Sequence, residues 1–165
     1  MPIKRVVGHE EIDKNPTLPV TAIDDICLQL ARDLLDTMHV SPGCVGLAAP
    51  QIAVPIRGFA VNVTDHKKTK TCHGELVLFN PVILKASNPV TAREGCMSVP
   101  ELTGDVSRYN NITISALNLQ GEEVVIETDA FEARALQHEI DHLDGLLFID
   151  RLAGPGALHI RKVYK

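Results

Sequence analysis

Two histidines, His138 and His142, are the residues of this sequence best suited to metal chemistry, and they belong to the pattern H-E-x-x-H. On a helix, residues four positions apart lie one turn apart on the same face, so both imidazoles can reach a single metal ion. Glu139, beside the first histidine, could take a proton from a water molecule at an open coordination position. The pattern favours metal-assisted hydrolysis, although so short a motif also arises by chance as two exposed histidines without a metal.

A catalytic metal site usually has three protein ligands, so a third ligand has to come from elsewhere in the chain. The extended zinc-protease pattern requires a histidine where this chain has Phe148, and no glutamate follows Glu139 to serve a second protease pattern. His159 is one remaining candidate. Cys96 is the better one, because a thiolate and two imidazoles suit Zn²⁺ or Fe²⁺. A single cysteine taken alone is more often a buried structural thiol.

The helices that must position these residues follow from the sequence pattern. Apolar residues at helical spacing predict a first helix over residues 21–38. A second helix carries the H-E-x-x-H pattern, with Asp129 as a suitable N-cap and Glu132 where a capping box has its acidic residue. Gly145 is suited to end this helix. The apolar stripe of the first helix consists of Ile23, Ile26, Cys27, Leu30, Leu34 and Met38.

Two faces of the second helix differ in character. Phe131 and Ala135 share the face of the two histidines, so this face is available for chemistry. The residues expected to point into the core are Leu136, Ile140 and Leu143.

Strands are predicted between the two helices. Residues 57–63 and 75–84 have strand character, and the polar loop 64–71 joins them. Residues 111–119 and 124–126 flank a Gln-Gly turn and predict an antiparallel hairpin. The order of elements predicts an α+β fold, in which antiparallel β-sheets pack around a central metal-binding H-E-x-x-H helix, with a further N-terminal helix.

Composition sets the broad class of protein. The 165 residues contain no repeat or linker, so we expect a single catalytic domain over residues 1–165. A net charge of −5 without a dense Lys/Arg block argues against a nucleic-acid site. No apolar run is long enough for a membrane span, and the N-terminus lacks the apolar core of a signal peptide. We therefore expect a cytoplasmic protein, or one of an organelle matrix if a transit peptide has been removed.

Three segments in register resemble the peptide deformylase family, which carries G-x-G-L-A-A-x-Q, E-G-C-L-S and Q-H-E-x-D-H in this order. The corresponding segments here are residues 44–51 (Cys-Val-Gly-Leu-Ala-Ala-Pro-Gln), 94–98 (Glu-Gly-Cys-Met-Ser) and 137–142 (Gln-His-Glu-Ile-Asp-His). The similarity extends along nearly all of the chain. It implies a metal-dependent hydrolase that removes the N-formyl group from the N-terminal methionine of newly made proteins and releases formate.

The resemblance also implies roles for individual residues. Glu139 would move the proton from water to the leaving amine, while Gln51 and the backbone N–H of Met97 would stabilise the oxyanion. The expected metal in the cell is Fe²⁺, with Zn²⁺, Ni²⁺ and Co²⁺ as alternatives that the sequence does not separate. The residues implied to hold this one divalent ion are Cys96, His138 and His142.

The substrate would be an N-formylmethionyl peptide or nascent chain, lying extended beside Val45 and Gly46 with strand-like hydrogen bonds. Val45, Phe131, Ala135 and the ring of His138 would form an apolar slot for the methionine side chain. For Phe131, a plain core position is a nearly equally good interpretation.

Four further residues complete the implied site. Glu94 and Gly95 would lie beside the substrate, and Leu47 and Arg108 would support the site. The resemblance implies an ion pair between Glu94 and Arg108, for which an ordinary surface salt bridge is the alternative.

The chain departs from the family pattern in two places. Cys44 replaces the first glycine of the first motif, which would strain the backbone if that position needs a positive φ. The alternative function is therefore a related hydrolase with altered N-acyl preference or reduced activity, although Cys44 could also fill a gap. Met97 replaces a leucine, a mild change. Only 23 residues (165 − 142) follow His142, so we expect ribosome association to be weak.

Overall fold

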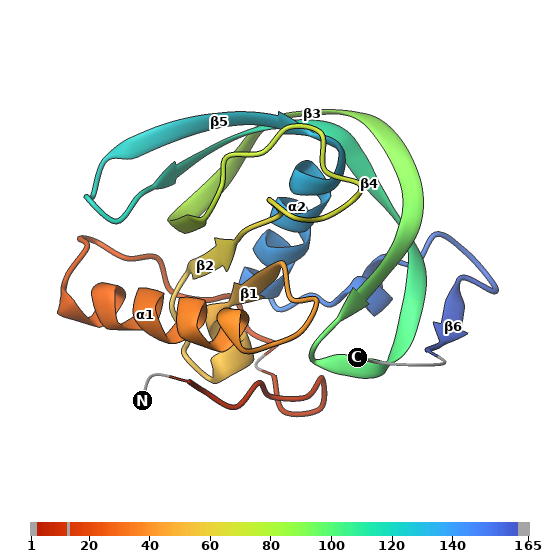
Figure 1. The fold of residues 1–165 in the computed structure, drawn as a ribbon, viewed down its shortest axis with the longest axis horizontal. Coiled ribbons are helices and arrows are strands. Elements are labelled where there is room, and N and C mark those ends of the chain that lie inside the picture. The colour runs from red at the N-terminus through yellow and green to blue at the C-terminus, as the bar shows by residue number, and fades with distance from the viewer. Residues whose placement is uncertain (1–2, 13, 162–165) are drawn as a thin grey trace.

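The computed structural model describes residues 3–12 and 14–161, which form an α+β fold with two α-helices and one curled antiparallel sheet (Figure 1). The elements in chain order are α1 (Asp25–His39), β1 (Gly46–Ala48), η1 (Ala49–Ile52), β2 (Gly58–Val61), β3 (Leu76–Cys96), β4 (Val99–Leu117), β5 (Glu123–Asp129), α2 (Ala130–Leu143), η2 (Phe148–Arg151) and β6 (Leu158–Ile160). The predicted order of helix, antiparallel strands and helix is confirmed.

The sheet has the strand order β1-β2-β3-β4-β5, with β6 paired to β4. Strands β3, β4 and β5 curve around α2, as Figure 1 shows, so the described strands form one curled sheet instead of the several sheets predicted. The predicted hairpin is confirmed as β4 and β5. Strands β3 and β4 are much longer than the predicted segments 75–84 and 111–119. The part of β3 beyond residue 84 is mostly exposed. It lacks the alternation of apolar and polar residues on which the prediction depended.

Helix α2 begins at the predicted N-cap but without the predicted capping box. The Asp129 side chain makes no cap hydrogen bond. Glu132 is fully buried and instead accepts hydrogen bonds from the backbone N–H of His73 (2.7 Å) and the hydroxyl of Thr128 (2.7 Å). Gly145 has φ +79°, which confirms it as the glycine that ends the helix.

Both helices bury an apolar face. On α2 the predicted core residues Leu136, Ile140 and Leu143 are buried against the sheet. Helix α1 packs on a second apolar cluster but starts later than predicted, at Asp25, because the Asp24 side chain accepts a hydrogen bond from a backbone N–H in the first turn. Ile26, assigned to the apolar stripe from the sequence, is 65% exposed.

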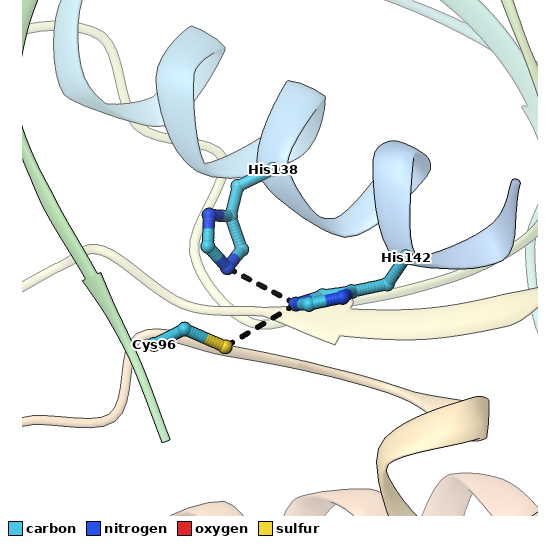
Figure 2. Close-up of side chains that lie close together, drawn as sticks. All are labelled: Cys96, His138 and His142. Carbon is cyan, nitrogen blue, oxygen red and sulfur yellow. Dashed lines mark hydrogen bonds between the residues drawn. The ribbon is translucent and has the colours of Figure 1, made fainter. Parts of the chain in front are cut away.

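The chain connections bring the three motif segments together. Cys96 ends β3 directly before the turn into β4, and its register partner is Val99. Strand β1 leads into η1, which carries Gln51. Both segments lie beside α2 at the level of its histidines (Figure 2). Within the described part of the chain, no helix has the length and apolar character needed to span a membrane.

Candidate active site

Three potential ligand atoms converge between β3 and α2 (Figure 2). The Sγ atom of Cys96 lies 3.4 Å from Nε2 of His142, and Nε2 of His138 lies 3.1 Å from the same nitrogen. All three ligand atoms lie within 4.8 Å of one another. His159, the other candidate third ligand, is elsewhere and pairs with Asp105 at 3.0 Å.

The geometry of this group fits one divalent transition metal. A tetrahedral ion with Zn–N near 2.0–2.1 Å and Zn–S near 2.3 Å separates its ligand atoms by about 3.3–3.6 Å. The observed separations of 3.1 and 3.4 Å are close to this range. One thiolate and two imidazoles form a ligand set suited to Zn²⁺ or Fe²⁺.

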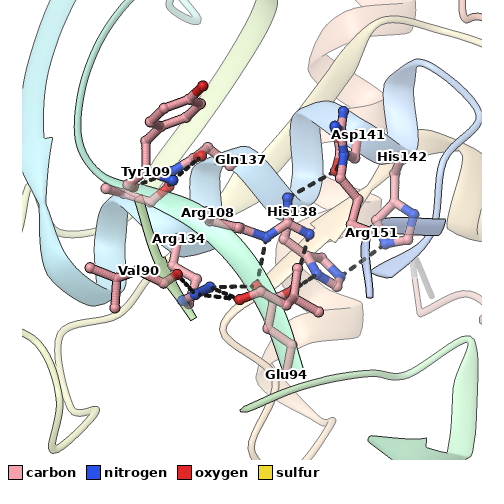
Figure 3. A network of polar contacts seen from close by, with 12 residues as sticks. Val90, Glu94, Arg108, Tyr109, Arg134, Gln137, His138, Asp141, His142 and Arg151 are labelled. Atoms are coloured by element: carbon pink, nitrogen blue, oxygen red, sulfur yellow. Dashed lines mark hydrogen bonds and ion pairs between the residues drawn. The ribbon is translucent and has the colours of Figure 1, made fainter. Parts of the chain in front are cut away.

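Glu94 orients the first histidine from behind. Its Oε1 accepts a hydrogen bond from Nδ1 of His138 (2.9 Å), which leaves Nε2 of that ring directed at the ligand group (Figure 3). Arg108 donates two hydrogen bonds to the same carboxylate, at 2.6 and 3.0 Å. Burial alone would raise the pKa of Glu94, but His138 and Arg108 outweigh burial and lower the pKa to about 2.

The Glu94–Arg108 pair is buried, with side-chain exposures of 7% and 3%, so the interpretation as a surface salt bridge was wrong. The network continues through Asp141, which accepts hydrogen bonds from Arg108 (2.8 Å) and from Arg151 (2.9 and 3.0 Å). Arg134 adds a further contact to Glu94 at 3.2 Å. Sequence reasoning missed the roles of Asp141, Arg134 and Arg151, although the Asp of the third motif was a signal for the first of them.

Glu139 lies in a buried position opposite β1. Its Oε2 is 2.5 Å from the point where a β-carbon on Gly46 would stand, so only glycine fits there without displacing the carboxylate. Its Oε1 has no hydrogen-bond partner within the described chain. Burial raises the pKa of Glu139 to about 7, against the opposing charges of His138 and Arg108.

Gln51 is held in a fixed orientation beside the ligand group. The backbone N–H of Ala48 donates to its Oε1 (3.0 Å), and its Nε2 donates to the hydroxyl of Ser98 (3.1 Å). The same Nε2 lies 3.5 Å from Sγ of Cys96. The role of Ser98 in this arrangement was not predicted from the sequence.

A cavity of about 290 Å³ opens at this group. All but three of the residues assigned to the site from the sequence line it. The exceptions are Leu47, Arg108 and His142, which are buried behind its walls.

The cavity wall also contains residues that sequence reasoning did not assign to the site. His66 stacks on Phe131 with ring centroids 3.7 Å apart and an angle of 5° between the planes. Phe131 is therefore a wall residue as well as a partner of the core. The other unassigned residues at this wall are Pro42, Gly43, Cys44 and four cations, which are Lys68, Arg93, Arg134 and Arg161.

Cys44 does not have the backbone strain expected if a residue other than glycine stood at a position with positive φ. The left-handed conformation belongs to Gly43, with φ +71°, and Cys44 has a negative φ. The Cys44 thiol donates to the carbonyl oxygen of Gly46 (Sγ to O, 3.2 Å) and packs against the core around α1. Burial raises its pKa to about 12.

Comparisons with known proteins agree with this geometry. Residues 4–157 match the family described as polypeptide deformylase. Peptide deformylase 1 of Bacillus subtilis is 41% identical over 154 residues, which cover 93% of this chain and 92% of the relative.

Solved structures give the same result. The crystal structure of peptide deformylase from Ehrlichia chaffeensis has a TM-score of 0.85 and 30% identity, covering 92% of this chain and 88% of that one. The Met-Ala-Ser-bound crystal structure of the class I type b peptide deformylase from Acinetobacter baumannii has a TM-score of 0.82 and 36% identity, covering 90% and 99%.

The match covers most of the chain, and the relatives are similar to it in both sequence and fold. The chain therefore belongs to the polypeptide deformylase family, enzymes whose general function is the metal-dependent removal of the formyl group from N-terminal formylmethionine.

Proposed function

We propose that this chain deformylates N-formylmethionyl peptides with one divalent metal ion held by Cys96, His138 and His142. The observation that carries the proposal is the convergence of these three ligand atoms within 4.8 Å, with the Glu139 carboxylate across from Gly46. Fe²⁺ is the metal we propose for the cell, because a thiolate with two imidazoles also suits iron.

Strand β1 provides an edge along which an extended peptide can bind. Val45 accepts a hydrogen bond from the N–H of Asn62 at its carbonyl (2.8 Å), so its polar groups face β2. Because polar groups alternate in direction along a strand, the N–H and C=O of Gly46 face away from β2, toward the cavity. We infer that the substrate backbone pairs with Gly46 and runs toward Gly95, which lines the same cavity.

The methionine side chain would occupy the apolar part of the cavity. Val45, Phe131 and Ala135 line it, and the stacked ring of His66 holds Phe131 in place. The Acinetobacter baumannii relative was crystallised with Met-Ala-Ser bound, which supports a site for a peptide that begins with methionine.

The positioned groups account for hydrolysis of a formyl amide. When bound, a divalent cation supplies positive charge that polarises a carbonyl group and makes a nearby water molecule more acidic. Glu139 accepts a proton from the water whose oxygen attacks the formyl carbon, and it gives this proton to the amine nitrogen as the C–N bond breaks. Gln51 Nε2 and the backbone N–H of Met97 donate to the formyl oxygen as it gains negative charge. The products are formate and a peptide with a free amino group.

Three further expectations belong to this proposal. The residues act as one catalytic domain, nascent chains are substrates as well as free peptides, and association with the ribosome is weak. An assay with ribosome-bound formylmethionyl chains would compare the two substrate classes directly.

The experiment that tests the proposal measures formate release from formyl-Met-Ala-Ser by protein loaded anaerobically with Fe²⁺ or Ni²⁺. Glu139→Gln should lower kcat by about 10²–10⁴-fold with one metal ion still bound per chain. Cys96→Ala should instead lose the metal together with the activity. Wild-type protein that holds one metal ion but releases no formate would contradict the proposal.

A further inference from the structure

The wall of the cavity has more positive than negative side chains. Its cations are Lys68, Arg93, Arg134 and Arg161, and its carboxylates are Glu94 and Glu139. This excess occurs in a chain whose net charge is −5, so positive charge is concentrated at this opening. Of the four cations, Arg134 is engaged with Glu94 (3.2 Å) and with the carbonyl oxygens of Val90 and Val106.

Two of the remaining cations, Arg93 and Arg161, lie near Gly95, toward which we have proposed that the peptide runs. A guanidinium nitrogen of Arg161 fills the space where a β-carbon on Gly95 would stand. Arg93 lies near the same point, because its Nη1 is 3.4 Å from the hydroxyl of Thr103, whose methyl group is 3.6 Å from the place of that β-carbon.

Arg161 reaches this position through β6. The strand pairs with β4, and the backbone N–H of Arg161 donates to the carbonyl of Glu101 (2.9 Å). The family match ends at residue 157, so both β6 and Arg161 lie beyond it. This cation is therefore a feature of the chain that the family match does not account for.

Lys68 lines the same cavity from the loop between β2 and β3. Its backbone N–H donates to Nδ1 of His66 (3.1 Å), whose ring stacks on Phe131, so the loop is anchored beside the cavity. The Lys68 side chain is exposed and makes no ion pair with the described residues. It also lines a second cavity of about 170 Å³, which shares Arg93, Phe131 and Arg134 with the first and so continues the groove.

We propose that Lys68, Arg93 and Arg161 form a rim that binds a carboxylate of the substrate and favours formylmethionyl peptides with an acidic group downstream of methionine. The inference rests on the proposed function and adds a substrate class to it. A peptide in extended conformation advances by about 3.3 Å per residue, so its second and third residues pass the rim when methionine fills the slot. Cations outside the reacting centre act through electrostatic complementarity, which affects substrate selection more than the chemical step.

The three rim cations should contribute unequally. Arg93 already pairs with Asp105 (2.9 Å), which also pairs with His159 (3.0 Å), so part of its charge is compensated. We therefore expect the largest effect from Lys68, which makes no ion pair with the described residues.

The test compares kcat/KM for three amidated peptides, formyl-Met-Ala-Glu, formyl-Met-Ala-Ser and formyl-Met-Ala-Lys, in low-salt buffer. The wild type should favour Glu over Lys by about tenfold, given a few-fold effect per exposed charge pair. Lys68→Glu should lower this ratio by about fivefold and Arg161→Glu by about threefold, and both should leave the serine peptide within about twofold. Lys67→Glu is the matched control, because Lys67 is an exposed neighbour that lines neither cavity. Salt at 0.5 M should reduce the preference in the wild type.

The carboxylate could be an acidic side chain or the C-terminus of a short peptide. Formyl-Met-Ala-Ser with a free C-terminus, compared with its amide, separates these sources. If the wild type prefers the free acid and Arg161→Glu removes this preference, the rim also binds the C-terminal carboxylate of a short peptide.

Binding of the deformylated peptides Met-Ala-Glu amide and Met-Ala-Lys amide, measured by calorimetry, tests the rim without turnover. Equal affinity for the two, or a ratio unchanged in Lys68→Glu and Arg161→Glu, would overturn the rim. Selective binding without any formate release from the formylated peptides would leave the rim intact and contradict the proposed function instead.

Discussion

Charged side chains are arranged differently on the deep side of the cavity, which consists of Glu94, Arg108 and Asp141, and on its rim. On the deep side, Glu94 and Arg108 are 7% and 3% exposed and pair with each other, and Asp141 extends the pairing. On the rim, Lys68 makes no ion pair with the described residues, and Arg93 is 51% exposed and pairs with Asp105, whose side chain is 35% exposed. Charges that satisfy one another in a buried place hold the ligands in position, whereas charges exposed to solvent remain available to a substrate.

The same contrast has an energetic form. Removing one partner of a buried pair leaves an uncompensated charge and costs roughly 3–5 kcal/mol, whereas an exposed pair contributes about 0–1 kcal/mol. The deep side should therefore respond to substitution through stability and metal binding, and the rim through substrate choice.

The largest expected effect comes from Arg108→Met, compared with Arg93→Met. Loss of Arg108 leaves Glu94 without its two hydrogen bonds from that side chain, so the free energy of unfolding should fall by roughly 3–5 kcal/mol. Loss of Arg93 should cost less than about 1 kcal/mol. Urea denaturation of both metal-loaded variants makes the measurement. Equal destabilisation by the two substitutions would remove the contrast between the deep side and the rim.

Gly46→Ala should have the next largest effect. The added methyl group would lie 2.5 Å from Oε2 of Glu139, so the carboxylate has to move. Because small misplacements of a catalytic group are costly, kcat should fall about 100-fold with metal content unchanged. Gly154→Ala is the control, since a β-carbon there would meet nothing within 4 Å. Full activity in Gly46→Ala would mean that Glu139 does not need this position.

Glu94→Gln should weaken metal binding by about 10–100-fold, because the carboxylate that orients His138 loses its charge. Competition with a chelator of known affinity measures this change. Glu75→Gln is a matched control, since Glu75 also pairs with a histidine, His39, at 3.0 Å, but on the exposed surface. If both variants bind the metal as tightly as the wild type does, the Glu94 carboxylate does not affect metal binding through His138.

The smallest functional effect is expected at Cys44, which lines the same cavity. Burial raises its pKa to about 12, so the thiol stays protonated at pH 8, where iodoacetamide requires a thiolate. The exposed Cys72 should therefore be alkylated first, as mass spectrometry of a time course would record. Cys44→Ser should change kcat/KM by less than about threefold, because a hydroxyl can also donate to the Gly46 carbonyl. Rapid alkylation of Cys44 would contradict the burial that raises the pKa of its thiol.

Features of local origin could be predicted from the sequence. The spacing of His138 and His142 put both rings on one helix face, since four residues make about one turn. Gly145 ended the helix as predicted, because a glycine readily adopts a positive φ. The α+β order of elements followed from apolar periodicity in the same way.

Features that depend on contacts between distant segments required the tertiary structure. Glu132 matched a capping box in sequence but is bound by His73, 59 residues away, because a buried carboxylate takes whichever donors the fold brings to it. The lengths of β3 and β4 depend on backbone pairing between strands, which exposed polar residues do not reveal. The position of Arg161 over Gly95 likewise depends on β6 joining the sheet, because charge is evident in a sequence but the place where it acts is set by packing.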